Sequence, residues 1–109
     1  MRNFSNVKRI VIKIGTNTLT QDGQVDSKYV RDVAKQVSEL LEQGKQVVIV
    51  SSGAIGMGKG HMGIAGSVSN LKMRQALAAI GQPLLMQEYR KAFLTYGVKT
   101  AQVLLTAEV

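Results

Sequence analysis

The sequence contains no cysteine, no tryptophan, one proline and one histidine. Without cysteine the chain can form neither disulfide bonds nor thiolate metal sites. Because His61 is the only histidine, a histidine-rich metal centre is a poor interpretation, and a Ser-His-Asp triad would depend on this one residue. We expect His61 to be a solvated loop residue.

Long apolar runs are also missing, and no stretch approaches the roughly 20 residues needed to cross a bilayer. The amino terminus shows no secretory leader pattern. Acidic residues are scarce: 14 Lys and Arg face 7 Asp and Glu, and the net charge of +7 favours anionic partners such as phosphates and carboxylates. The basic residues are scattered and do not interleave with the five aromatic residues, which argues against nucleic-acid binding. We therefore expect a cytoplasmic protein with no membrane and no nucleic-acid partner.

The residues that are present are typical of one small globular domain. The chain has 109 residues, of which 45% are hydrophobic and 19% charged. Arg9–Gly15 and Val47–Val50 are rich in β-branched residues and predict two strands. Between them, apolar residues recur at helical spacing from Tyr29 to Leu41, after Asp26 or Ser27 as N-cap. Strand, helix and strand predict a βαβ unit with parallel strands.

The remaining segments extend this pattern into an α/β fold. Gln21–Gln24 predicts the turn of a small hairpin. Lys59–Asn70, with three glycines and no periodicity, predicts a mobile loop, or a short helix followed by a lid. Leu71–Tyr96 returns to helical spacing, with Pro83 predicting a kink or the junction of two helices. Val98–Leu105 predicts a third strand. The fold class that follows is α/β, a three-layer αβα arrangement with a mainly parallel sheet.

The stretch Val47–Gly58, VVIVSSGAIGMG, carries the strongest local signal. Two serines, Ser51 and Ser52, end the strand, and glycines allow a ligand to approach the backbone closely. Ligands of open α/β sheets bind at the carboxyl ends of strands, and a helix that begins near Ala54 would direct its N-terminus at an anion. From this motif alone, a tight turn without a ligand remains an equally good interpretation.

The first predicted strand ends in a similar way. Lys13 interrupts an apolar run, and Gly15 and Thr16 follow it directly. Glycine and hydroxyl groups after a strand can donate hydrogen bonds to phosphate oxygens, and a lysine beside them can neutralise a transferring phosphoryl group. A lysine that simply faces solvent is the alternative. The stretch matches neither the P-loop nor the GxGxxG pattern. If the two strands are neighbours, both ends face one crevice.

Four stretches together carry a family resemblance. They are VIKIGTNTLT (Val11–Thr20), VVIVSSGAIGMG (Val47–Gly58), KMRQALAAIGQPLLMQEY (Lys72–Tyr89) and YGVKTAQVLLT (Tyr96–Thr106). With these stretches the chain resembles the amino-terminal part of the glutamate 5-kinases, a branch of the amino-acid kinase family, from about Arg9 to Thr106.

The resemblance implies an ATP-dependent phosphotransferase with a carboxyl acceptor, which uses Mg²⁺ and acts in proline biosynthesis. Its substrates would be ATP and L-glutamate, whose γ-carboxylate becomes glutamyl 5-phosphate. Lys13 would be the catalytic residue, in contact with the ATP phosphates together with Gly15 and Thr16. The residues that would hold glutamate are Ser52, Gly53 and Ala54.

The resemblance covers only part of an amino-acid-kinase domain, so we expect residues 1–109 to be its truncated, substrate-binding portion. The nucleotide-binding half has no counterpart here, and none of the seven carboxylates is an obvious magnesium ligand. We therefore expect this chain to be inactive alone. The alternative is a non-catalytic binding or oligomerisation module, because an incomplete sheet exposes an edge and an apolar face. In either case we expect a homo-oligomer.

Overall fold

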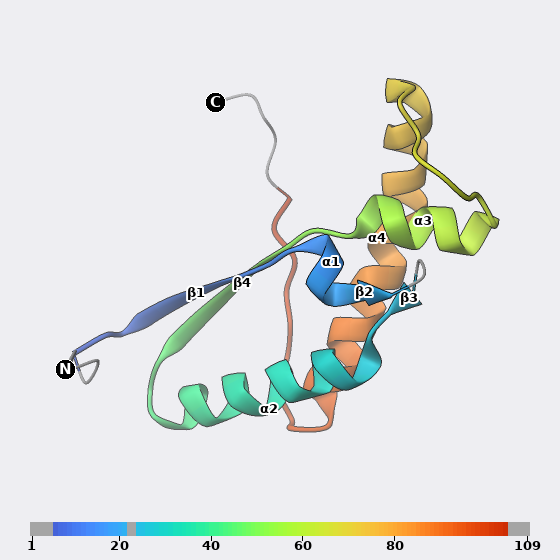
Figure 1. The fold of residues 1–109 in the computed structure, drawn as a ribbon. Coiled ribbons are helices and arrows are strands. Elements are labelled where there is room, and N and C mark those ends of the chain that lie inside the picture. Colours follow the sequence, from blue (N-terminus) through green and yellow to red (C-terminus); the bar gives the residue numbers. More distant parts are fainter. Residues whose placement is uncertain (1–5, 22–23, 105–109) are drawn as a thin grey trace.

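The computed structural model describes residues 6–21 and 24–104 (Figure 1). Strands and helices alternate along most of this part of the chain, and the predicted α/β class is confirmed. In chain order the elements are β1 (Arg9–Ile14), α1 (Thr16–Leu19), β2 (Thr20–Gln21), β3 (Gln24–Val25), α2 (Ser27–Glu42), β4 (Gln46–Ser51), α3 (Ala54–Met62) and α4 (Leu71–Leu94).

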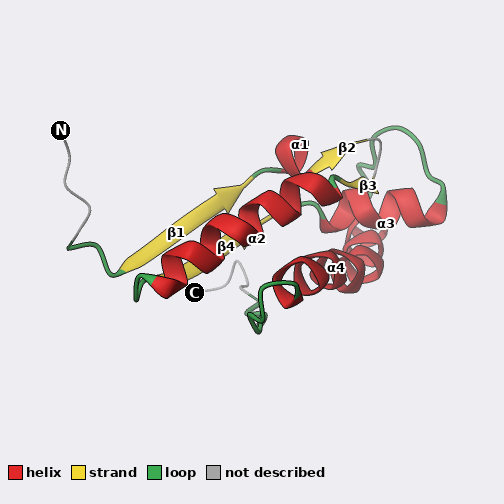
Figure 2. Cartoon of the chain, turned by 90° about the horizontal axis from the view of Figure 1, so that it is seen from below, coloured by secondary structure: helices red, strands yellow, loops and turns green. Residues whose placement is uncertain are grey.

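Strands β1 and β4 form the main sheet and run parallel, as predicted. The register places Lys13 opposite Val50 and Ile14 opposite Ser51. Helix α2 supplies the crossover that a parallel pair requires, and it lies alongside both strands (Figure 2). The carboxyl ends of the two strands therefore lie at the same end of the sheet.

One face of this sheet is packed and the other is open. Ile14 is only 3% exposed and belongs to the core with the helices, whereas Val11 and Val50, on the opposite face, are 61% and 44% exposed. Side chains alternate between the two faces of a strand, which explains this division. The apolar run of β4 predicts cover on both faces, and within residues 6–21 and 24–104 that prediction is wrong for the face of Val11 and Val50.

Helix α2 begins and ends as its sequence predicts. The Asp26 carboxylate accepts a hydrogen bond from the Tyr29 backbone N–H at 3.1 Å, which makes Asp26 the N-cap. After the helix, Gly44 has a φ of +81°, the left-handed conformation that commonly follows a helix. The buried stripe of the helix consists of Val30, Ala34 and Val37.

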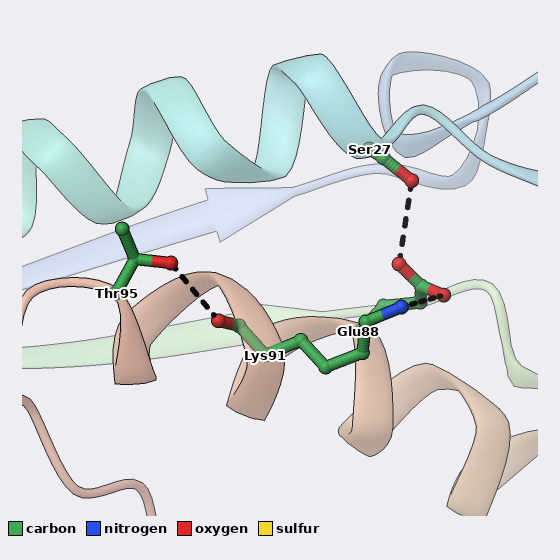
Figure 3. Close-up of polar contacts among 4 residues, drawn as sticks. All are labelled: Ser27, Glu88, Lys91 and Thr95. Atoms are coloured by element: carbon green, nitrogen blue, oxygen red, sulfur yellow. Dashed lines mark hydrogen bonds and ion pairs between the residues drawn. The ribbon is translucent and has the colours of Figure 1, made fainter.

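The core lies between α2, α4 and the packed face of the sheet. Its buried members are Ile14, Leu19, Val30, Ala34, Val37, Leu85, Tyr89, Ala92 and Phe93. A polar contact joins the same two helices at the surface: the Ser27 hydroxyl donates to Glu88 at 3.3 Å, and Glu88 also pairs with Lys91 at 3.9 Å (Figure 3). The ion pair lies within α4, and a single hydrogen bond at the surface adds little stability, so apolar burial holds α4 against α2.

Helices α3 and α4 approach each other so closely that their backbones touch. A Cβ atom on Gly81 of α4 would collide with the Ala54 carbonyl oxygen, and one on Gly58 of α3 would collide with the Leu77 carbonyl oxygen. Glycine at both positions therefore permits the crossing. The N-terminal half of α4 is in this way fixed to the helix that follows β4.

Helix α4 is continuous through Pro83, so the prediction of two helices meeting there is wrong. Proline removes one backbone donor, and the carbonyl that loses its partner belongs to Ala79, an exposed residue that water can reach. Gly81 and Leu85, on either side of the proline, are both buried. Packing before and after Pro83 thus keeps the helix in one piece.

Of the two alternatives for Lys59–Asn70, the structure shows helix at the start of the segment, because α3 continues to Met62. Gly63, with a φ of +69°, ends the helix, and residues 64–70 form the connection to α4. His61 therefore lies on a helix, and its side chain is exposed.

The predicted third strand is also absent from the described residues. Residues 98–104 adopt no regular structure, and Leu105 lies outside the described part of the chain. Val103 and Leu104 are 79% and 75% exposed. A β-branched sequence becomes a strand only beside a partner edge, and no described strand pairs with this segment.

The small hairpin is present. Thr20 of β2 lies opposite Val25 of β3 in an antiparallel pair. The Asp22-Gly23 turn predicted to connect them lies outside the described residues. Thr16–Leu19, which precedes the hairpin, forms a single helical turn, so the hydroxyl-rich segment after β1 is ordered by its own backbone bonds.

Candidate functional site

The ends of β1 and β4 meet, as the sequence predicts for neighbouring parallel strands. The Thr16 hydroxyl and the Ser52 hydroxyl are hydrogen-bonded at 2.8 Å. The Ser52 backbone N–H also donates to the Ile14 carbonyl at 3.3 Å, which extends the parallel ladder by one residue. The hydroxyl groups that follow the two strands therefore lie side by side.

Helix α3 begins immediately after this meeting point. Gly53 precedes it with a φ of +113°, a conformation that side chains rarely adopt, and it lies against Leu19 and Thr20. No described side chain caps the first turn of α3, so the first backbone N–H groups of this helix can donate hydrogen bonds to a ligand. A helix N-terminus carries partial positive charge and suits an anion. The predicted start at Ala54 is confirmed.

A pocket of about 550 Å³ opens at this place. Its volume is in the range of small-molecule sites. Its wall brings together four of the residues singled out from the sequence: Thr16, Ser52, Gly53 and Ala54. The other lining residues are Ser51, Ile55, Gly56, Lys59, Ser67, Val68, Arg74, Ala78 and Gln82.

The charged residues of the pocket wall are both cationic. Lys59 of α3 donates its ammonium group to the Gly66 carbonyl, and Arg74 of α4 donates Nη1 to the Val68 carbonyl at 3.1 Å. Among residues 6–21 and 24–104, no carboxylate lines the pocket. The uncapped start of α3 and these two side chains together make the pocket suited to an anionic ligand.

Sequence reasoning missed Lys59 and Arg74. Lys59 could have been found, because it lies three and four residues after Gly56 and Ile55 on α3 and so shares their face once the helix is extended. Arg74 gives no such signal. It reaches the pocket only because α3 and α4 pack closely, which the spacing of residues along the chain does not reveal.

Lys13 and Gly15 do not line the pocket. Lys13 is exposed and pairs with Val50 on the open face of the sheet, away from α2. Gly15 is exposed at the turn into α1, with no atom close to where a Cβ would lie. The phosphate-binding roles predicted for these two residues remain predictions. His61 is exposed and also lies outside the pocket wall.

The hydroxyl of the buried residue Tyr89 is hydrogen-bonded to the end of β4. Tyr89 of α4 is 5% exposed, and its hydroxyl is hydrogen-bonded to the Ser51 hydroxyl at 2.8 Å. Burial raises the pKa of the Tyr89 phenol above its ordinary value of 10.0, and the hydrogen bond with Ser51 lowers it in part. Ser51 is thereby held between the core and the pocket.

The donor set of the described residues does not match a metal centre. Residues 6–21 and 24–104 contain no group of three histidine, aspartate or glutamate side chains close enough to share a metal ion. The hydroxyls and cations of the pocket wall are poor ligands for Mg²⁺, which prefers carboxylates and phosphates.

Within residues 6–21 and 24–104, no helix has the length and apolar character to span a membrane.

Comparison with known proteins gives a consistent match. Residues 8–109 match the model of the Amino acid kinase family. The chain is similar to the "Glutamate 5-kinase" of Methanosarcina mazei, with 49% identity over 96% of this chain, and to that of Thermus thermophilus, with 44% identity over 99%. The chain spans 29% of the length of each of these two relatives.

Proposed function

Because the chain belongs to the amino acid kinase family, we propose that it forms the acceptor-substrate side of a glutamate 5-kinase active site. The reaction would transfer the γ-phosphoryl group of ATP to the γ-carboxylate of L-glutamate. Support comes from relatives named glutamate 5-kinase that are 44–49% identical to the chain, of which it spans less than a third. In this proposal, the pocket at the strand ends binds the acceptor substrate.

One observation carries the proposal: the hydrogen bond between the Thr16 and Ser52 hydroxyls. It joins the end of the strand that bears Lys13 to the start of the Gly53-Ala54 turn. In the proposed complex, Ser52 and the first N–H groups of α3 donate hydrogen bonds to a substrate carboxylate. A phosphoryl group held from the Thr16 side would then lie next to that carboxylate.

The chemistry we propose needs positioning and charge neutralisation more than proton transfer. The carboxylate is ionised at neutral pH and can attack the γ-phosphorus without a general base, so a bond forms from carboxylate oxygen to phosphorus and the bond to ADP breaks. Lys13, Gly15 and Thr16 would contact the phosphates, and the Lys13 ammonium would offset charge on the transferring group. The residues described here supply no magnesium ligands, and we assign Mg²⁺ no step.

Replacing Ser52 tests the proposal. We expect Ser52→Ala to weaken binding of L-glutamate about tenfold or more in isothermal titration calorimetry, because a hydrogen bond to a charged group contributes roughly 1.5–3 kcal/mol. Ser38→Ala makes the same chemical change on α2, where the hydroxyl bonds to the Lys35 carbonyl far from the pocket wall. We expect Ser38→Ala to bind like the wild type. Equal affinity of both variants, or a wild type that does not bind L-glutamate, would contradict the proposal.

A further inference from the structure

We propose that Lys59 and Arg74 recognise the second carboxylate of the acceptor substrate, the α-carboxylate, across the pocket from the strand ends. The proposal rests on the function proposed above and assigns a specificity role to two residues outside the motif at the end of β4. It concerns a ligand with two anionic groups, one at each end of a short chain.

The charge of the pocket wall motivates the assignment. A glutamate ligand brings two carboxylates, and the N-terminus of α3 with Ser52 can satisfy one of them. The second carboxylate is attracted to the wall where a cation faces it, because opposite charges at close range stabilise each other. Within the described part of the chain, the charged residues of the wall are Lys59 and Arg74, and both are cationic.

Their position along the helices decides which carboxylate they meet. The reacting carboxylate must lie near Thr16 and Ser52, where the phosphoryl group would enter. Lys59 follows Ala54 by five residues on α3, which places its backbone about 7 Å further along the helix axis. The other end of the substrate would point in that direction.

Arg74 reaches the same wall from the other helix. It lies in the first turn of α4, and the close crossing at Gly58 and Gly81 fixes α4 against α3. The two cations therefore come from two elements held in one arrangement by backbone contact. A carboxylate between them would be bound from two sides.

Both side chains are held in place but keep donors to spare. The Lys59 ammonium uses one of its three donors on the Gly66 carbonyl, and the Arg74 guanidinium uses one of five on the Val68 carbonyl. Residues 64–70, the connection between α3 and α4, in turn contribute Ser67 and Val68 to the wall. The cations are thus oriented before a ligand binds, and the guanidinium retains enough N–H groups for a paired contact with a carboxylate.

The test compares L-glutamate with its α-amide, isoglutamine, which keeps the γ-carboxylate but lacks the negative charge at the α position. We expect the wild type to bind L-glutamate at least about tenfold more tightly than the α-amide in calorimetric titrations. Arg74→Gln and Lys59→Gln should each reduce this ratio severalfold, and Arg74→Lys should retain part of it. Lys72→Gln removes the same charge two residues from Arg74, outside the pocket wall, and should keep the wild-type ratio.

Three outcomes would overturn the proposal while leaving the proposed function in place. The affinities for both ligands could fall equally, which would mean that the cations only support residues 64–70. In the second outcome, the variants change the affinity for L-glutamate relative to glutamine, the γ-amide, and not relative to the α-amide. In the third, the variants bind L-glutamate as the wild type does but bind ATP more weakly. A wild type that binds no L-glutamate would remove the proposed function, and this proposal with it. Thermal unfolding of each variant establishes that it is folded before titration.

Discussion

At the scale of single residues, the site depends on a hydrogen bond from the buried core as well as on the hydroxyl groups that line the pocket. Tyr89 is buried in the core, and its hydroxyl reaches the Ser51 hydroxyl at the end of β4. Ser51 is followed directly by Ser52, whose hydroxyl meets Thr16. Two hydrogen bonds at neighbouring residues therefore connect the end of β4 to the core and to the segment after β1.

Removing the Tyr89 hydroxyl should lower stability in a pH-dependent manner. We expect Tyr89→Phe to reduce the free energy of unfolding by about 1 kcal/mol at neutral pH, the net value of a typical hydrogen bond. Burial raises the folded-state pKa of Tyr89 above 10.0, so above that pH the phenol ionises in the unfolded chain while it stays neutral in the folded one. This contribution is fully present below pH 10.0 and is lost as the pH rises through the folded-state pKa.

Urea unfolding of the wild type and Tyr89→Phe between about pH 8 and about pH 11 measures this effect. The wild type should lose stability faster than the variant at the alkaline end, because only the wild type carries the buried phenol. A difference in stability that stays constant over this range would show that burial of Tyr89 does not disfavour its ionised form.

The sequence could place the residues whose role depends on a strand end. Thr16, Ser52, Gly53 and Ala54 follow β-branched runs directly, and parallel pairing is enough to bring them together. Arg74 could not be placed in this way, because it joins the site through the packing of two helices. The side-chain direction of Lys13 was equally hidden. It depends on which face of the sheet the helices cover.

At the scale of elements, the crossing of α3 and α4 shapes the pocket. The wall draws on α3 and on the first half of α4, and the backbones of the two helices touch at Gly58 and Gly81. Neither position has a positive φ, so the glycines are needed for space and not for backbone conformation. A single added methyl group at this crossing would separate the helices or force one of them to shift.

Two glycine-to-alanine substitutions in these helices should therefore have different effects on stability. Gly81→Ala places a methyl group against the Ala54 carbonyl and should cost about 1–3 kcal/mol of unfolding free energy or more. Gly56→Ala lies in α3, where a Cβ would approach only the Thr16 methyl group, at 4.0 Å. That substitution should be neutral or stabilise by up to about 1 kcal/mol, because alanine favours helix.

Chemical denaturation of both variants distinguishes a close crossing from a general cost of replacing helical glycine. If Gly56→Ala and Gly81→Ala were equally destabilising, the contact between α3 and α4 would not be the reason. If Gly81→Ala were neutral, the two helices would have to lie further apart than the structure places them.

Elements with local signals could be predicted from the sequence, and elements that depend on tertiary partners could not. Helix α2 has an N-cap at Asp26, an apolar stripe and a glycine after its end, and each is found where expected. The strand expected at residues 98–104 has the right composition but pairs with no described strand. Pro83 does not divide α4, because packing on both sides of it outweighs one lost hydrogen bond.

At the scale of the whole molecule, the described part of the chain is less compact than a closed domain. Its radius of gyration is 15.5 Å, against about 13 Å expected for a compact chain of this length. In the same part of the chain, one face of the sheet, which carries Val11, Val48 and Val50, is open. The predicted homo-oligomer and the predicted inactivity of residues 1–109 alone remain predictions.

The pocket wall does not include the three exposed valines of this open face. It is built by strand ends and helix starts that are already in contact with one another. Binding of an acidic amino acid at that place should therefore be a property of the chain itself. It should not require the open face to be covered.

Mapping of backbone amide shifts by two-dimensional ¹⁵N NMR, during titration with L-glutamate, tests this most directly. We expect the largest changes at Thr16, at Ser52 and in the first turn of α3, with smaller changes at Lys59 and Arg74. Amides of α2 such as Ser38 should not move. Saturating changes confined to the open sheet face, or no changes at millimolar glutamate, would contradict the assignment of this pocket to the substrate.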